Sequence, residues 1–362
     1  MGRHVAADCP ELDRLVDDAC AAIGREIEAL KVPHLSCVVL GGGYGRGEGG
    51  AREKLEGRVG VGERNNSTLQ PKTPTLALSN DLDFFAITDD GAPEADSVTA
   101  IGAALKPISE KWTAKLGVDV DFTVKTPWRL KHDEERIMVQ ELLRGYFDVA
   151  GVKGDRLFSG IERRPAEAIP WMEAARLLMN RGMGLLFAMK EESRSSKLKL
   201  EKGTIPISNS NSRLELYEKR DFVNRNINKC ILGVGDARLV ARRAYAWRAV
   251  DRAKALGDAL YDSALEWKFR PADEPVCNWE KAREAWLAAL DEVSFGSRHA
   301  RDSRGSRTLR SAARWLARRR TVGELRTLGL DPVVRILETV SRHVRSRRAP
   351  DASLMRDWEV FN

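Results

Sequence analysis

The chain has few of the residues that build disulfide frameworks or histidine-based metal centres. Its 362 residues include five cysteines and five histidines. The cysteines are odd in number, widely scattered and without a C-x-x-C pair, and the histidines are dispersed without metal-ligand spacing. These absences argue against a disulfide-stabilised fold, a zinc site and a catalytic histidine.

Long apolar runs are also missing. No run reaches the roughly 18 apolar residues that a membrane-spanning helix needs, and the N-terminus lacks the charged-then-apolar pattern of a secretory leader. We therefore expect a cytoplasmic protein. With 43% hydrophobic residues, the chain can form substantial cores, and its length favours two domains.

The basic residues are unevenly distributed. Lys and Arg number 60 against 53 acidic residues, a net charge of +7, but Arg298–Arg348 alone holds fifteen arginines and four acids. Several of these arginines recur every three or four residues, which in a helix forms a stripe able to track phosphates. Gly305 and the nearby serines favour a loop for the first half, and Trp315 is its one aromatic residue. This region is a candidate contact for nucleic acid.

The most informative stretch is Leu35–Glu48, LSCVVLGGGYGRGE. An apolar run that ends in glycines is typical of a buried strand whose backbone turns tightly toward a ligand. If a helix opens there, its free N–H groups favour phosphate, so Gly42 and Gly43 are expected to bind phosphates. The dinucleotide fingerprint does not fit, because Gly45–Gly50 begins too far after the strand and no acid ends a second strand. The P-loop does not fit either, because the Lys-Ser/Thr pair is missing.

Two acidic segments follow the glycines. Asp81 and Asp83 share one face of an extended strand, with Leu82 turned to the core, and Asp119 and Asp121 repeat this arrangement. Mg²⁺ prefers oxygen ligands, usually one or two carboxylates with substrate phosphates. The two segments therefore predict a site for Mg²⁺ or Mn²⁺ beside a phosphate-binding turn.

The order of these parts resembles the nucleotidyltransferase superfamily that includes DNA polymerase β, in its form with a C-terminal helical domain. The family pattern is a strand, a Gly-Ser or Gly-Gly turn that opens a helix, an Asp-x-Asp strand and a third Asp on the next strand. Gly42–Glu48 and Asp81–Asp83 match it residue by residue, and the third acid is Asp121 or, alternatively, Asp119. Residues 51–78 exceed the family's usual spacing and are interpreted as an insertion, either a passive loop or a lid.

The resemblance implies a magnesium-dependent enzyme that transfers a nucleoside monophosphate from a nucleoside triphosphate to an acceptor hydroxyl and releases pyrophosphate. Asp81 and Asp83 would hold the metal on the triphosphate, and Asp121 would hold a second metal and help to deprotonate the acceptor. The acceptor is left open among a small molecule, a protein and RNA. The alternative is a non-catalytic nucleotide- or RNA-binding protein with the same fold.

Three further residues are candidates for nucleotide contact. Tyr44 could instead pack in the core, and Arg46 could instead pair with Glu48 at the surface. Lys229 is a candidate by resemblance, because relatives use a lysine of the helical domain, and its alternative is a solvated helix lysine.

The remaining pattern predicts an α+β protein with a nucleotidyltransferase domain at 1–160, built on a small mixed sheet, and a helical bundle at 161–362. In the bundle, the polar pair Asn180–Arg181 interrupts an apolar helix and could face a cleft, form a buried hydrogen-bonded pair or lie at an exposed edge. The expected strands are 34–40, 82–88 and 118–126, and 147–160 is expected to be irregular. The expected helices are 11–30, 97–116, 134–146, 166–189, 214–232, 236–260, 279–293, 308–320 and 332–345, with a solvated loop at 191–213.

Overall fold

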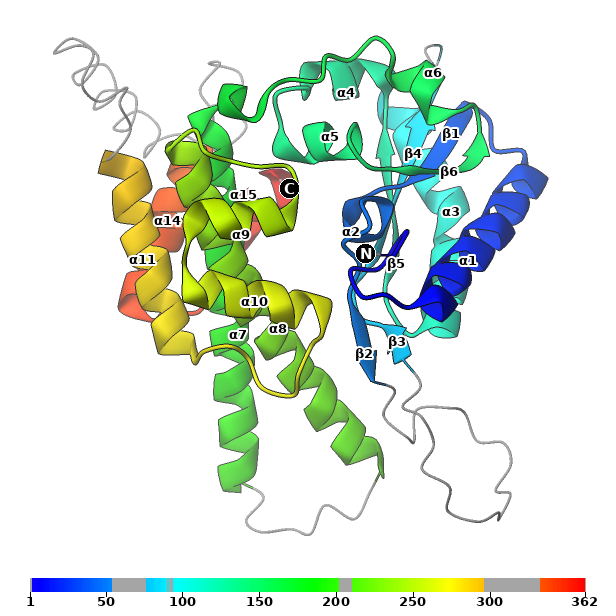
Figure 1. The fold of residues 1–362 in the computed structure, drawn as a ribbon. Coiled ribbons are helices and arrows are strands. Elements are labelled where there is room, and N and C mark those ends of the chain that lie inside the picture. The colour runs from blue at the N-terminus through cyan, green and yellow to red at the C-terminus, as the bar shows by residue number, and fades with distance from the viewer. Residues whose placement is uncertain are drawn as a thin grey trace, which may run out of the picture. The chain divides into compact units, whose positions relative to one another are not determined.

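A computed structural model of the chain describes residues 2–53, 76–89, 91, 94–201, 210–295 and 333–361. Most of the expected insertion, the expected helix 308–320 and most of the arginine-rich stretch lie outside these residues. The fold is α+β. Two compact units are present, Met1–Arg164 with Lys268–Ala272, and Pro165–Trp267 with Asp273–Asn362 (Figure 1).

A four-stranded mixed sheet forms the centre of the first unit. Its strands lie in the order β5 (Val120–Lys125), β4 (Leu82–Thr88), β1 (Leu35–Leu40) and β6 (Phe147–Gly151). β4 and β5 are parallel, whereas β1 is antiparallel to both of its neighbours. The sequence predicts three of these strands closely. It misses β6, an edge strand whose partly exposed residues show no apolar alternation.

Both faces of the sheet are covered by helices, so β1 and β4 are apolar along most of their length. α1 (Pro10–Leu30) and α3 (Glu94–Leu116) pack with Val38, Leu82 and Phe84 on one face. On the other face, Val39 and Phe85 join a second core with residues of three short helices (Figure 1). These helices are α4 (Pro127–His132), α5 (Ile137–Leu142) and α6 (Gly154–Phe158).

The first and last residues of the expected insertion pair with each other. β2 (Ala51–Glu53) and β3 (Leu76–Leu78) form a two-stranded antiparallel ladder in which Ala51 lies opposite Leu78. The two described ends of the segment therefore lie side by side, next to the start of β4.

The described residues of the second unit form helices and the loops that join them. Two tryptophans of α11 (Trp279–Phe295), Trp279 and Trp286, donate indole N–H hydrogen bonds of 2.8 Å to carbonyls of α7 (Trp171–Glu201). The accepting residues are Leu185 and Leu178. These bonds fix α11 against α7 while the indole rings fill the core. In the described part of the chain, no helix combines the length and the apolar character needed to cross a bilayer. The elements are η1 (Ala166–Ala168), α7 (Trp171–Glu201), α8 (Ser210–Ala241), α9 (Ala249–Leu256), α10 (Ala259–Phe269), α11 (Trp279–Phe295), α14 (Val333–Ser346) and α15 (Ala352–Phe361).

Two expectations for this unit are wrong. α7 continues to Glu201, through part of the expected loop 191–213, because its charged residues are adequate helix formers even without an apolar face. α8 continues through Gly233 and Gly235, where a new helix was expected to begin at 236. Both glycines are buried against neighbouring helices, so tertiary packing outweighs their low helix propensity.

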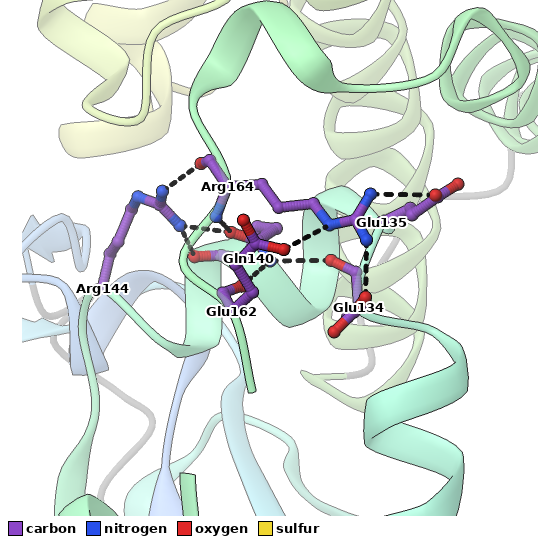
Figure 2. A network of polar contacts seen from close by, with 6 residues as sticks. All are labelled: Glu134, Glu135, Gln140, Arg144, Glu162 and Arg164. Atoms are coloured by element: carbon purple, nitrogen blue, oxygen red, sulfur yellow. Dashed lines mark hydrogen bonds and ion pairs between the residues drawn. The ribbon is translucent and has the colours of Figure 1, made fainter. Parts of the chain in front are cut away.

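A polar network closes the end of the first unit. Gln140, on α5, is 1% exposed, and its amide uses its full hydrogen-bonding capacity (Figure 2). Its Nε2 donates to the carbonyls of Glu134 and Glu162 at 2.7 and 2.8 Å. Its Oε1 accepts from Arg144 Nη1 at 2.6 Å and from the Arg164 backbone N–H at 2.9 Å. Gln140 therefore ties the last residues of the unit to α5.

The two arginines extend this network. Arg144 donates to the Arg164 carbonyl, and Arg164 donates to Glu134 at 2.5 Å and to Glu135 at 2.9 Å (Figure 2). The hydrogen bond to Glu134 raises the pKa of the Arg164 guanidinium, whereas burial lowers the pKa of Arg144. Both arginines therefore act as hydrogen-bonded clamps on the segment 162–164.

We predict that Gln140→Leu lowers the free energy of unfolding by about 2–4 kcal/mol, because it leaves buried carbonyl and N–H groups without partners. Urea titration followed by tryptophan fluorescence measures this change. Glu135→Gln is the matched control, since that carboxylate is 55% exposed and its ion pair is worth less than about 1 kcal/mol. Equal losses for the two variants would contradict the role assigned to Gln140.

Candidate functional site

The glycine turn directly follows β1. Gly42–Gly45 forms the single helical turn α2, and Gly42 has a φ of +59°. That left-handed conformation is costly for any residue with a Cβ. The Gly41 N–H donates a hydrogen bond of 2.8 Å to the carbonyl of Asp83. The turn is thus fixed beside the start of β4, although the segment opens one turn rather than a long helix.

The parallel pairing of β4 with β5 brings two of the predicted carboxylates together. In this register Asp83 lies opposite Asp121, and Leu82 lies opposite Val120. Leu82 and Val120 are buried, whereas both aspartates are exposed on the alternate face. Neighbouring strands are about 4.8 Å apart, so the two carboxylates are neighbours at this end of the sheet.

The other two aspartates flank this pair. Asp81 immediately precedes β4, and alternation puts it on the same side as Asp83. The Leu82 N–H donates to the carbonyl of Asp119 at 2.8 Å, which places Asp119 beside Asp81 at the mouth of the two strands. The two candidates for the third acid therefore differ in their position along β5. Asp121 lies within the strand, opposite Asp83, whereas Asp119 lies just before the strand.

Gly42 and Asp83 are in direct contact. A Cβ on Gly42 would lie 2.2 Å from Oδ2 of Asp83. A side chain on residue 42 would therefore have to displace the Asp83 carboxylate. The structure therefore brings together the predicted phosphate-binding glycine and the predicted metal ligand, from segments about 40 residues apart in the sequence.

An N-terminal strap, residues 2–9, supports the far side of the turn. Val5 forms an isolated parallel bridge with Gly49, in which the Gly49 N–H donates to the His4 carbonyl at 3.0 Å. His4 is 1% exposed, and its Nδ1 and Nε2 lie 3.1 and 3.0 Å from the Tyr44 carbonyl and from Asp17. This strap is not predictable from the sequence, because its residues show no periodic pattern.

Tyr44 belongs to the core rather than to a ligand-facing surface. It is fully buried, and its hydroxyl donates to the Gly50 carbonyl at 2.8 Å and accepts from the Ser79 N–H at 3.2 Å. Asn80, which sequence reasoning did not single out, accepts from the Gly50 N–H at 2.6 Å. These bonds join the end of the glycine loop to the chain that enters β4. The packing alternative therefore replaces nucleotide contact for Tyr44.

Arg46 is held by carboxylates. Its Nη1 lies 3.1 Å from Glu141, and its Nε lies 3.5 Å from Glu48, with the side chain 14% exposed. Glu48 also lies 3.8 Å from Nζ of Lys268. The pairing with Glu48 is the one expected as the alternative, but it lies mostly beneath the surface. Arg46 therefore orders the glycine loop from within.

Lys229 lies on α8 in the second unit and is exposed. This position fits the solvated helix lysine that was the alternative to nucleotide contact. It is not among the residues that the first unit brings together.

The carboxylates at the N-terminal ends of β4 and β5 are ligands that suit a hard cation. Among the residues that the structure describes, no group of three or more His, Cys, Asp or Glu side chains is arranged to hold a metal ion. Asp83 and Asp121 nevertheless offer carboxylate oxygens from adjacent strands. Mg²⁺ commonly takes one or two protein carboxylates and completes its octahedron with water and substrate phosphate. The residues present fit this mode of binding.

We predict that Gly42→Ala destabilises the protein more than Gly117→Ala does. Both glycines have positive φ, +59° and +69°, but a Cβ at Gly117 would meet nothing within 4 Å. The backbone cost of about 1–2 kcal/mol is therefore common to both variants, and only Gly42→Ala displaces Asp83. Chemical denaturation should show an additional loss of about 1 kcal/mol or more for Gly42→Ala. Indistinguishable stabilities would mean that Asp83 is free to move away.

The chain was compared with protein-family models, with curated proteins and with solved structures, and none of these comparisons returned a match.

Proposed function

We propose that the first unit is a divalent-metal-dependent nucleotidyltransferase. It would transfer a nucleoside monophosphate from a nucleoside triphosphate to an acceptor hydroxyl and release pyrophosphate. The observation that carries the proposal is the alignment of Asp83 with Asp121, directly against Gly42. The order of glycine turn, Asp-x-Asp and third Asp along the chain supports the same function by its resemblance to the nucleotidyltransferase superfamily.

Electrostatics favours a cation at the strand mouths. Like charges on directly opposed residues of neighbouring strands destabilise a sheet. Asp83 and Asp121 form such a pair, and Asp81 and Asp119 add two more carboxylates at the same edge. A bound Mg²⁺ or Mn²⁺ would remove this repulsion, so the arrangement has a physical reason if the site binds metal.

The glycine turn would bind the triphosphate. Gly42 and Gly43 carry no side chains, so phosphate oxygens can approach the backbone N–H groups of the turn closely. The strap and the buried Tyr44 hold this backbone in place. The phosphates would thus be positioned next to the carboxylates without any rearrangement of the turn.

In the reaction, an oxygen of the acceptor hydroxyl forms a bond to the α-phosphorus. The bond from that phosphorus to the bridging oxygen breaks, and pyrophosphate leaves. Asp121 would accept the hydroxyl proton, while Asp81 and Asp83 hold the metal on the phosphates. The metal, when bound, neutralises the negative charge that accumulates on the phosphate oxygens. All three side chains are at least partly exposed, so an acceptor can reach them from solvent.

We predict that the protein releases pyrophosphate from at least one labelled nucleoside triphosphate with Mg²⁺ or Mn²⁺. Asp83→Asn and Asp121→Asn should each lower the rate by at least about a hundredfold, because each removes charge from the metal site without changing side-chain size. The measurement is pyrophosphate release with each of the four triphosphates, and EDTA should abolish it.

Asp89→Asn is the matched control for this experiment. Asp89 follows the opposite end of β4, is exposed, and lies 3.2 Å from His34. Its substitution should leave turnover within about twofold of the wild-type rate, because surface substitutions away from the site have small effects. Turnover that survives both Asp83→Asn and Asp121→Asn would refute the assigned site. Tight triphosphate binding without turnover would favour the non-catalytic alternative.

A further inference from the structure

Arg181 lies within the second unit, on α7. Its Nε is buried and has no hydrogen-bond partner. Among the described residues no carboxylate lies within ion-pair distance of it, and the residue as a whole remains partly exposed. Arg181 is therefore a recessed cation whose Nε is covered, while the residue as a whole stays partly open to solvent.

Other arginines of this unit, one buried and two partly exposed, have counter-ions. Arg252 lies 2.9 Å from Asp236, and Arg238 and Arg176 lie 3.0 and 2.6 Å from Glu292 and Glu173. The acid that acts electrostatically on Arg181 is Asp236, which is already paired with Arg252 and accepts a 2.7 Å hydrogen bond from Tyr261. The positive charge of Arg181 is thus poorly compensated within the fold.

Burial disfavours the charged form of Arg181. Burial lowers the pKa of the Arg181 guanidinium, and the nearby Cys230 and Asp236 only partly oppose this effect. A desolvated charge without a partner destabilises a protein. A fold that keeps such a group retains it at the expense of stability, which is characteristic of binding sites.

The helix opposite is shaped to admit the arginine. A Cβ on Gly233 would lie 2.4 Å from Cγ of Arg181 and 3.0 Å from Nε. A glycine in a helix interior costs about 1 kcal/mol relative to alanine, so this glycine has a steric role. One turn along α7, Gly184 has the same relation to α8, since a Cβ there would lie 2.5 Å from Oδ1 of Asn226.

A second cation stands on the same face of α8. Lys229 precedes Gly233 by four residues, so the two lie one turn apart on one side of the helix. Lys229 is exposed. Lys229 therefore places a further basic residue on the side of α8 that carries Gly233.

We propose that Arg181 is the anion-binding group of a ligand site between α7 and α8, and that the ligand presents a phosphate or carboxylate group. The planar guanidinium can bind either group through two parallel N–H···O hydrogen bonds. The anionic group of the ligand would serve as the counter-ion of Arg181. This inference does not depend on the nucleotidyltransferase proposal, because its residues all belong to the second unit.

The test is calorimetric titration of the full-length protein with inorganic phosphate and, separately, with acetate. EDTA is present, and chloride keeps the ionic strength constant. The wild-type protein should bind at least one of the two anions, and the preferred one identifies the ligand class. Arg181→Met should weaken that binding at least about tenfold, the expected effect of losing a charge-assisted hydrogen bond. Asp83→Asn should not weaken it, which separates this site from the proposed triphosphate site.

A second readout distinguishes binding from a structural role. Arg181→Met should be at least as stable as the wild-type protein in chloride, because the substitution removes a desolvated charge. Arg176→Met is the control on the same helix. It should retain anion binding but lose stability, because it removes the 2.6 Å ion pair between Arg176 and the buried Glu173. Unchanged anion affinity in Arg181→Met, no binding of either anion by the wild type, or a stability loss equal to that of Arg176→Met would each overturn the proposal.

Discussion

Two carboxylates held opposite each other on adjacent parallel strands form the constraint around which the first unit is arranged. The register of β4 and β5 places Asp83 directly opposite Asp121. This register is fixed because Leu82 and Val120 are buried in the core on the other face. Gly42 must then lack a side chain, because any Cβ would collide with Asp83. The opposed acids and the left-handed glycine are each unfavourable by themselves, and the strap is not needed to form the sheet. The cation and phosphate ligand that we propose would give all three features one purpose.

In the second unit, the comparable feature is the positive charge of Arg181. There the neighbouring helices supply Arg252 and Arg238 with carboxylates, whereas within the described ranges no carboxylate pairs with Arg181. In the first unit two like charges lie opposite each other, and in the second a buried guanidinium nitrogen has no hydrogen-bond partner among the described residues. Such positions are the ones at which a ligand, rather than the chain, completes the electrostatics.

Much of the site could be predicted from the sequence, because its parts are carried by strong local signals. Continuous apolar runs identified β1 and β4, and alternation within Asp81–Asp83 correctly indicated which side chains face outward. The strand β6 was missed because an edge strand needs no apolar alternation. The continuity of α8 was missed because the propensity of Gly233 and Gly235 is local, whereas the packing that outweighs it comes from other helices. The partners of Tyr44 and Arg46 could not be predicted for the same reason. Ser79, which donates to Tyr44, and Glu141, which pairs with Arg46, are distant from them in sequence and belong to no motif.

The most direct measurement of the central claim is anomalous diffraction from crystals grown with Mn²⁺ and a non-hydrolysable nucleoside triphosphate. The account predicts a manganese peak within coordination distance of the carboxylates of Asp83 and Asp121, with the phosphates lying along the backbone of Gly42 and Gly43. A manganese–triphosphate complex bound elsewhere on the protein, with these two aspartates facing only solvent, would contradict it.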